Sequence, residues 1–224
     1  MNHLIRISLL LLLPLLASSC LTLEETYSFK ANGSGTMTYT MDMSGMANLL
    51  GEAGRESGED PTAGLGFDDV GPRLKNIGGI SGVKVTSDNK QYIYTIAFKF
   101  ANIAALNSAL NQLHRADDEG IVAEPMHTYF EMKNGVVTRT HTPSSEEVVD
   151  ALIGEDEDAE STRMILESMK YRINMSFKQP IKTVYSAGKV EQSGKKQEKV
   201  LIEVNFAELA ADTDVLNTTV VLKN

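Results

Sequence analysis

Residues 36–43 read TMTYTMDM, and their strict alternation of apolar and polar side chains decides the fold class. In an extended strand, successive side chains point to opposite faces. One face of this strand is therefore apolar, and the other carries threonines and an aspartate. A strand of this kind is typical of an antiparallel sheet that is covered on one side. The apolar face consists of Met37, Tyr39, Met41 and Met43.

Three further stretches alternate in the same way and are predicted to be strands. Their apolar faces consist of Tyr92, Tyr94, Ile96, Phe98 and Phe100 in the first, Tyr171, Ile173, Met175 and Phe177 in the second, and Val200, Ile202, Val204 and Phe206 in the third. Glycine-containing turns at 32–35 and 133–135 predict two hairpins, because such turns suit the twist of paired strands.

Helices are fewer than strands. Residues 102–114 place Ile103, Leu106, Leu110 and Leu113 on one stripe, with Asn102 as the expected N-cap. Further helices are expected after the capping-box spacing of residues 144–147, over 161–170 and, as a short one, over 45–52. The sequence therefore predicts an α+β fold in which antiparallel β-sheet packs against a few short helices. Flexible loops are expected near 51–66, 154–160 and 186–198.

The first nineteen residues resemble a signal peptide. Arg6 supplies a positive start, an apolar run of about ten residues follows, and the small residues 17–19 suit a signal peptidase. The run is too short for a transmembrane helix, which needs about 20 apolar residues. We therefore expect residues 1–19 to be cleaved and residues 20–224 to form a single domain.

Cys20 is the only cysteine, and it follows the small residues directly. Residues 16–20, LASSC, resemble the lipobox of bacterial lipoproteins. That resemblance implies that the Cys20 thiol receives a diacylglyceryl group and anchors the chain to a membrane. Leu21 follows where an aspartate would favour the inner membrane, which points to the outer membrane of a bacterial cell envelope. The alternative is an ordinary cleaved signal followed by an incidental free thiol.

Residues 27–44, YSFKANGSGTMTYTMDMS, and residues 173–209, INMSFKQPIKTVYSAGKVEQSGKKQEKVLIEVNFAEL, resemble bacterial lipoproteins with an LppM-like domain. That group combines a lipidated cysteine, an early strand with a glycine-containing turn, a helical middle and a late hairpin entered through a proline. The resemblance implies a role in the cell envelope and no catalytic residues.

The charge of the chain limits its partners. The formal net charge is −9, and nucleic-acid affinity depends on Lys and Arg that neutralise phosphates. We therefore expect no nucleic-acid binding, and repulsion from anionic lipid surfaces, so that the anchor would supply membrane association. With one cysteine, no intramolecular disulfide forms, and the core alone must hold the fold.

Candidate metal ligands are sparse. Three histidines, His114, His127 and His141, lie after the signal segment. A two-residue hairpin turn pairs Thr142 with His127 and Thr128 with His141, so these two imidazoles point to opposite faces. The acidic run near 154–160 lacks the ligand spacing of a calcium loop. We expect neither a metal nor a cofactor.

Catalytic motifs are missing from the sequence as well: it contains no G-x-S-x-G, no P-loop and no HExxH. The prediction is a membrane-anchored envelope lipoprotein with a binding or structural role and no enzymatic activity. Its many methionines suggest an apolar ligand or peptide held between sheet and helices, or a protein partner. The alternative is an envelope hydrolase with a dispersed site, indicated by His127, Glu131 or Asp42 meeting in one pocket.

Overall fold

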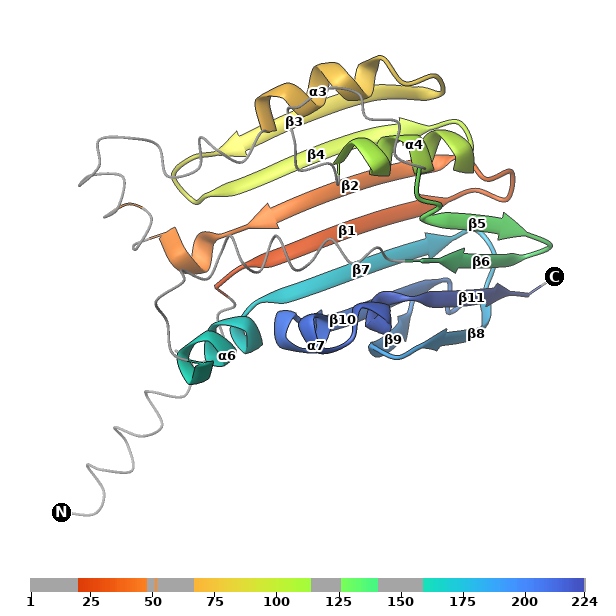
Figure 1. The fold of residues 1–224 in the computed structure, drawn as a ribbon. Coiled ribbons are helices and arrows are strands. Elements are labelled where there is room, and N and C mark those ends of the chain that lie inside the picture. Colours follow the sequence, from red (N-terminus) through yellow and green to blue (C-terminus); the bar gives the residue numbers. More distant parts are fainter. Residues whose placement is uncertain (1–19, 48–50, 52–66, 114–125, 141–158, 224) are drawn as a thin grey trace.

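Two β-sheets form the framework of the protein (Figure 1). The computed structural model describes residues 20–47, 51, 67–113, 126–140 and 159–223. The large sheet has the strand order β3-β4-β2-β1-β7-β10-β9, and the small sheet has the order β5-β6-β11-β8. The strands of the large sheet are β1 Thr22–Phe29, β2 Gly35–Asp42, β3 Ile80–Asp88, β4 Ile93–Phe100, β7 Lys170–Phe177, β9 Lys189–Ser193 and β10 Lys199–Asn205. Those of the small sheet are β5 Phe130–Lys133, β6 Val136–Arg139, β8 Ile181–Ser186 and β11 Thr218–Leu222.

Short helices accompany the sheets, so the α+β class is confirmed. They are η2 Ser44–Met46, α3 Phe67–Lys75, α4 Ile103–Leu113, α6 Ala159–Ser168, α7 Phe206–Ala211 and η4 Thr213–Leu216. The helix predicted over 102–114 is α4, and the Asn102 side chain accepts a hydrogen bond from the Ala105 main-chain N–H at 2.8 Å, as an N-cap does. The helix predicted over 161–170 is α6, two residues earlier. The helix predicted after residue 144 and half of the one predicted over 45–52 lie outside the described residues.

The alternating stretches form strands with one buried face, as predicted. Met37, Ile96, Ile173 and Ile202 are each at most 1% exposed. Tyr92 is an exception, because it precedes β4 in a turn and has a left-handed φ of 54°. Phe206 is also displaced, since it begins α7 rather than ending a strand. Both hairpins predicted from glycine-containing turns are present as β1–β2 and β5–β6.

The prediction of purely antiparallel sheet is wrong at the centre of the large sheet. β1 and β7 pair in parallel, with Glu25 opposite Ile173 and Tyr27 opposite Met175. The alternation of side chains reports which face of a strand is buried, and it carries no information on the direction of the neighbouring strand. The pair joins segments almost 150 residues apart, so no local turn signal could reveal it.

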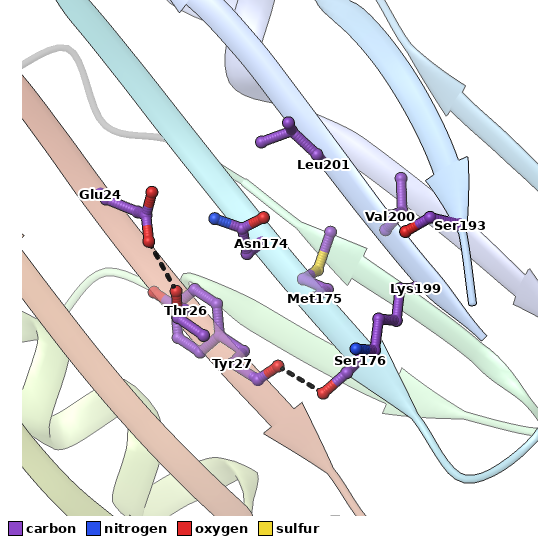
Figure 2. Close-up of a pocket in the computed structure, with 10 residues that line it drawn as sticks. All are labelled: Glu24, Thr26, Tyr27, Asn174, Met175, Ser176, Ser193, Lys199, Val200 and Leu201. Atoms are coloured by element: carbon purple, nitrogen blue, oxygen red, sulfur yellow. Dashed lines mark hydrogen bonds between the residues drawn. The ribbon is translucent and has the colours of Figure 1, made fainter.

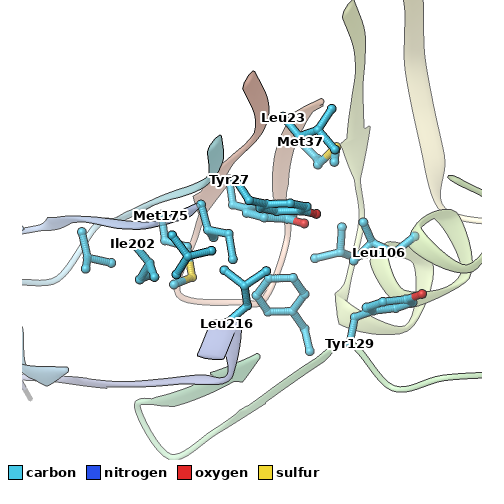
Figure 3. Close-up of a cluster of buried hydrophobic side chains, with 14 of the residues drawn as sticks. Leu23, Tyr27, Met37, Leu106, Tyr129, Met175, Ile202 and Leu216 are labelled. Carbon is cyan, nitrogen blue, oxygen red and sulfur yellow. The ribbon is translucent and has the colours of Figure 1, made fainter. Parts of the chain in front are cut away.

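The small sheet and the helices α3, α4 and α7 lie over one face of the large sheet, and the core fills the space between (Figures 1 and 3). Leu106 and Leu110 of α4 are fully buried there. The Tyr27 ring meets the Phe130 ring of the small sheet edge to face at 4.8 Å between centroids. The other face of the large sheet, the outer face, presents mostly threonine, serine and charged side chains.

The expected flexible loops have different outcomes. Residues 186–198 contain β9, which pairs with β10 in register from Lys199↔Ser193 to Glu203↔Lys189. Periodicity did not reveal this strand because most of its side chains are exposed. Residues 154–158 and 52–66 lie outside the described residues, and residue 159 begins α6.

The strands of the large sheet run between two ends, which we call the Cys20 end and the distal end. At the Cys20 end, Thr22 pairs with Asp42 and with Lys170. At the distal end, Phe29 pairs with Gly35 and Phe177. The 8 residues of β1 separate the two ends, which corresponds to about 26 Å at about 3.3 Å per residue. The tip of the β5–β6 hairpin and the C-terminus lie at the distal end (Figure 1).

Gly35 provides a test of the close packing at the distal end. A Cβ at this position would collide with the carbonyl oxygen of Ser28 and the ring of Phe100. We expect Gly35→Ala to lower the free energy of unfolding by about 2 kcal/mol or more, because the strand backbone must shift. Gly78→Ala is the matched control, since its Cβ meets nothing within 4 Å, and it should change stability by less than about 1 kcal/mol. Urea titration of both variants measures the free energy of unfolding. Equal losses of stability in the two variants would contradict the close packing around Gly35.

Candidate functional site

Cys20, the predicted lipidation site, lies directly at the start of the large sheet. Its side chain is half-buried and forms no disulfide. The next residue, Leu21, is 2% exposed, and its carbonyl oxygen accepts a hydrogen bond from the Lys170 main-chain N–H at 2.9 Å. Strand β1 then begins at Thr22. A group attached to Cys20 would therefore be joined to the sheet without an intervening linker.

A buried carboxylate lies a few residues along the same strand. Glu25 points into the core and is 0% exposed. Its Oε2 accepts hydrogen bonds from the Tyr27 hydroxyl and from Arg139 Nη2, both at 2.8 Å. Its Oε1 accepts a hydrogen bond from the Tyr171 hydroxyl at 2.6 Å. The carboxylate thus has partners on β1, β6 and β7, and we call these four residues the buried polar cluster.

Arg139 is the only member of the buried polar cluster that comes from the small sheet. It is 1% exposed and forms a salt bridge with Glu25 across the core. Its Nε and Nη1 are buried and have no hydrogen-bond partner among the described residues. A buried guanidinium needs an opposite charge nearby, because transfer of an isolated ion out of water is very costly. The salt bridge therefore fixes how the small sheet sits on the large one.

The electrostatics of the cluster keep its tyrosines neutral. Burial raises the pKa of Tyr27 and Tyr171 well above the usual value, the negative charge of Glu25 raises it further, and the positive charge of Arg139 opposes the shift. Burial and Glu25 also raise the pKa of Tyr39, which lies opposite Glu25 on β2. For Arg139, burial favours the neutral form, but Glu25 and the two tyrosines outweigh it, so the pKa lies above its usual value.

The cluster is suited to holding the fold together rather than to reacting with a substrate. All four of its residues are at most 4% exposed, so a solute cannot reach their polar atoms.

Sequence reasoning missed the cluster, although a signal existed. Glu25 alternates in phase with the buried Leu23 and Tyr27, and Arg139 alternates in phase with the buried Val137. A charged residue on the apolar face of a predicted strand indicates a buried pair.

A shallow pocket lies on the outer face of the large sheet (Figure 2). Its volume is about 430 Å³. Glu24, Thr26, Asn174, Ser176 and Leu201 contribute side chains from three adjacent strands. Thr26 donates a hydrogen bond to the Glu24 carboxylate at 3.2 Å, and Ser176 donates one to the Tyr27 carbonyl at 3.1 Å. The lining of the pocket mixes polar and apolar groups. The pocket lies on the opposite side of the sheet from the apolar interior predicted to hold a ligand.

The three residues that would indicate a hydrolase do not meet. Asp42 ends β2 at the Cys20 end, where its carboxylate accepts from the Ser44 main-chain N–H at 2.9 Å. His127 precedes β5, with Nε2 3.3 Å from the Thr140 carbonyl oxygen. Glu131 is exposed on β5 of the small sheet, and none of the three lines the outer-face pocket.

Two of the three candidate histidine ligands, His114 and His141, lie outside the described residues. In the part of the chain that the structure describes, no three His, Cys, Asp or Glu side chains are grouped so as to hold a metal ion. No described helix has both the length and the apolar character needed to cross a bilayer.

No protein-family model matches the chain, and no curated protein matches it. Among solved structures, the chain is similar to the NMR structure of the folded domain of the LppM protein of Mycobacterium tuberculosis. The similarity covers 92% of this chain and 91% of that chain, with 9% sequence identity and a TM-score of 0.43. A similarity at this identity and TM-score establishes neither a family nor a function for the chain.

The salt bridge of the buried polar cluster can be tested by a double-mutant cycle. We expect Arg139→Met to lower the free energy of unfolding by about 3–5 kcal/mol, because it leaves the Glu25 charge buried and unpaired. Adding Glu25→Gln to Arg139→Met should recover part of this loss, since the unpaired charge is then removed. The control is Arg163→Met, which breaks a pair exposed at 76% and 47% and should cost less than about 1 kcal/mol. A double variant as unstable as the sum of its single variants would contradict the coupling.

The buried tyrosines predict a loss of stability at high pH. Their raised pKa values mean that the folded state keeps protons that the unfolded state releases above about pH 10, so stability falls as the pH rises. With Tyr27, Tyr39 and Tyr171 all protonated in the fold, the slope should approach about 4 kcal/mol per pH unit. Urea titrations between pH 8 and pH 11 measure the slope, which Tyr27→Phe should lower by about a third because one of the three protons is removed. Tyr185→Phe changes a side chain that is 63% exposed and should leave the slope as it is.

Proposed function

We propose that the chain is a lipoprotein of the bacterial cell envelope that is held on a membrane by acyl chains on Cys20. The observation that carries this proposal is the position of Cys20. It follows a lipobox-like stretch in the sequence, and it immediately precedes the buried Leu21 at the start of β1. Because Cys20 adjoins the buried Leu21 and strand β1, an acyl anchor on this sole cysteine would hold the domain by its large sheet.

The physics of such an anchor suits this chain. One acyl chain gives marginal membrane binding, while two or more hold a protein stably, at about 0.8 kcal/mol per buried methylene. Because Leu21 is hydrogen-bonded to Lys170 and buried, the Cys20 end of the large sheet would face the bilayer at close range. Outer-membrane placement remains part of the proposal and rests on Leu21. The burial of Leu21 gives this residue a structural role in addition.

A binding or structural role without catalysis is the second part of the proposal. It is supported by the separation of Asp42, His127 and Glu131 over two sheets and by the inaccessibility of the buried polar cluster. Fully buried side chains such as Leu106, Leu110 and Ile173 fill the region between sheet and helices. This filling gives no support to an apolar ligand between the sheet and the helices.

Lipidation can be tested in a bacterial host that carries out the modification. The unmodified chain is expected in the membrane fraction, and mass spectrometry of its N-terminal peptide should show a diacylglyceryl-modified Cys20 as the first residue. Cys20→Ser should move the protein to the soluble fraction, because the acceptor thiol is gone. Ser19→Ala, which keeps a small residue before the cysteine, is the matched control and should remain on the membrane. An N-terminal peptide with a free thiol at Cys20 would overturn the proposal.

A further inference from the structure

The distal end of the large sheet gathers most of the exposed lysines of the described chain. They come from three turns, from the ends of strands and of helix α3, and from the chain end. The lysine-rich end, as we call it, consists of Lys30, Lys75, Lys99, Lys133, Lys178, Lys182, Lys195, Lys196, Lys199 and Lys223, all of them exposed.

Backbone contacts place these turns side by side. The Leu222 N–H donates to the Gly135 carbonyl and the Lys223 N–H donates to the Pro180 carbonyl, both at 2.8 Å. These bonds bring the β5–β6 turn, the C-terminal strand and the β7–β8 connection together. Gly33, in the β1–β2 turn, lies against Met132 of β5. These turns lie at one end of both sheets (Figure 1).

The lysines of this end are not neutralised by described neighbours. None of the ten forms an ion pair with another residue in the described part of the chain. Only two described acidic residues lie among them, Glu131 and Glu198, and the Glu198 carboxylate accepts from the Lys196 main-chain N–H at 2.8 Å. Among the described residues, the lysine-rich end therefore carries a large local excess of positive charge.

The opposite end has the reverse character. In the half of the sheet nearer Cys20, four described cations form ion pairs: Arg163, Lys170, Arg172 and Lys189. Another cation of this half, Lys90, is exposed in the β3–β4 turn. Its acidic residues are Asp42, Asp88, Glu160, Glu167, Glu203, Glu208, Asp212 and Asp214. Positive and negative charge are thus separated along the strands.

The net charge of −9 predicted repulsion from anionic lipid surfaces, and the charge separation changes this expectation. Screening limits the reach of an exposed charge to about 8–10 Å at physiological salt. The two ends are about 26 Å apart by the length of β1. A surface that approaches the distal end therefore meets the field of the lysines, largely independent of the acidic residues at the Cys20 end.

We propose that the lysine-rich end docks on an anionic lipid surface through phosphate-bearing headgroups. A flat headgroup layer can contact several turn tips at once, and each Lys near such a surface contributes favourably. A protein partner is less suited, because interface cores are rich in aromatic side chains and depleted of Lys. The exposed large apolar residues of the described chain, Val85, Met126, Met164 and Tyr185, all lie outside this end. The proposal does not depend on the anchor at Cys20, which lies at the other end of the sheet.

Vesicle binding tests this proposal. The mature chain, residues 20–224 with Cys20→Ser, carries neither the apolar leader nor an acyl group. It is mixed with vesicles of neutral phosphatidylcholine or of phosphatidylcholine with 30% phosphatidylglycerol, and bound protein is measured by sedimentation. We expect binding to the anionic vesicles to exceed binding to the neutral ones at least about ten-fold at low salt. Raising the salt to about 0.5 M should abolish this difference, because the Debye length falls to a few ångströms.

Charge-matched variants locate the contact. Lys30→Gln, Lys133→Gln and Lys178→Gln together remove three charges from three turns of the lysine-rich end, and should weaken anionic-vesicle binding at least about ten-fold. Lys90→Gln, Arg163→Gln and Lys189→Gln remove three exposed charges from the Cys20 half, and should change it less than two-fold. Equal effects of the two sets would overturn the proposal. Equal binding to both vesicle types would also overturn it. This holds even if the chain binds polyglutamate, a soluble acidic peptide, instead of the anionic vesicles.

Discussion

The salt bridge between Glu25 and Arg139 is the contact on which the relation of the two sheets depends. Its two charged groups come from strands in different sheets and meet at 2.8 Å where neither is exposed by more than 1%. Burying two charges costs several kcal/mol per ion, and their attraction offsets this cost only in a good geometry with further hydrogen bonds. Tyr27 and Tyr171 supply those bonds. Any other placement of the small sheet would leave one charge unpaired in the core, so the pair selects a single arrangement.

The parallel contact between β1 and β7 makes this cluster possible. It places Tyr171 of β7 beside Glu25 of β1, while the antiparallel β2 supplies Tyr39 on the other side. Aromatic rings surround the cluster: Tyr27 stacks near Phe29, and both meet Phe130 of the small sheet. The polar atoms thus sit within an apolar interior, where their pairing is strong and where an unpaired group would be costly.

The long axis of the large sheet separates the two surfaces to which we assign a function. Cys20 leads directly into β1 at one end, and the lysine-rich end closes the other. Because Leu21 is already part of the core, an anchor at Cys20 would orient the sheet as well as tether it. Within the described part of the chain, charge follows the same direction, since acidic residues and ion-paired cations gather near Cys20 and lysines without an ion pair gather far from it.

The sequence by itself determined the strands with one buried face, the two hairpins and the cap at Asn102. These follow from local periodicity, glycine-containing turns and short motifs, which a few consecutive residues contain. Only the tertiary structure decided the parallel pairing of β1 with β7, the burial of Glu25 against Arg139, and the gathering of the lysines. The physical reason is that each of these joins segments far apart in the chain, and neither the direction of a distant strand nor the meeting of distant turns is encoded in local alternation.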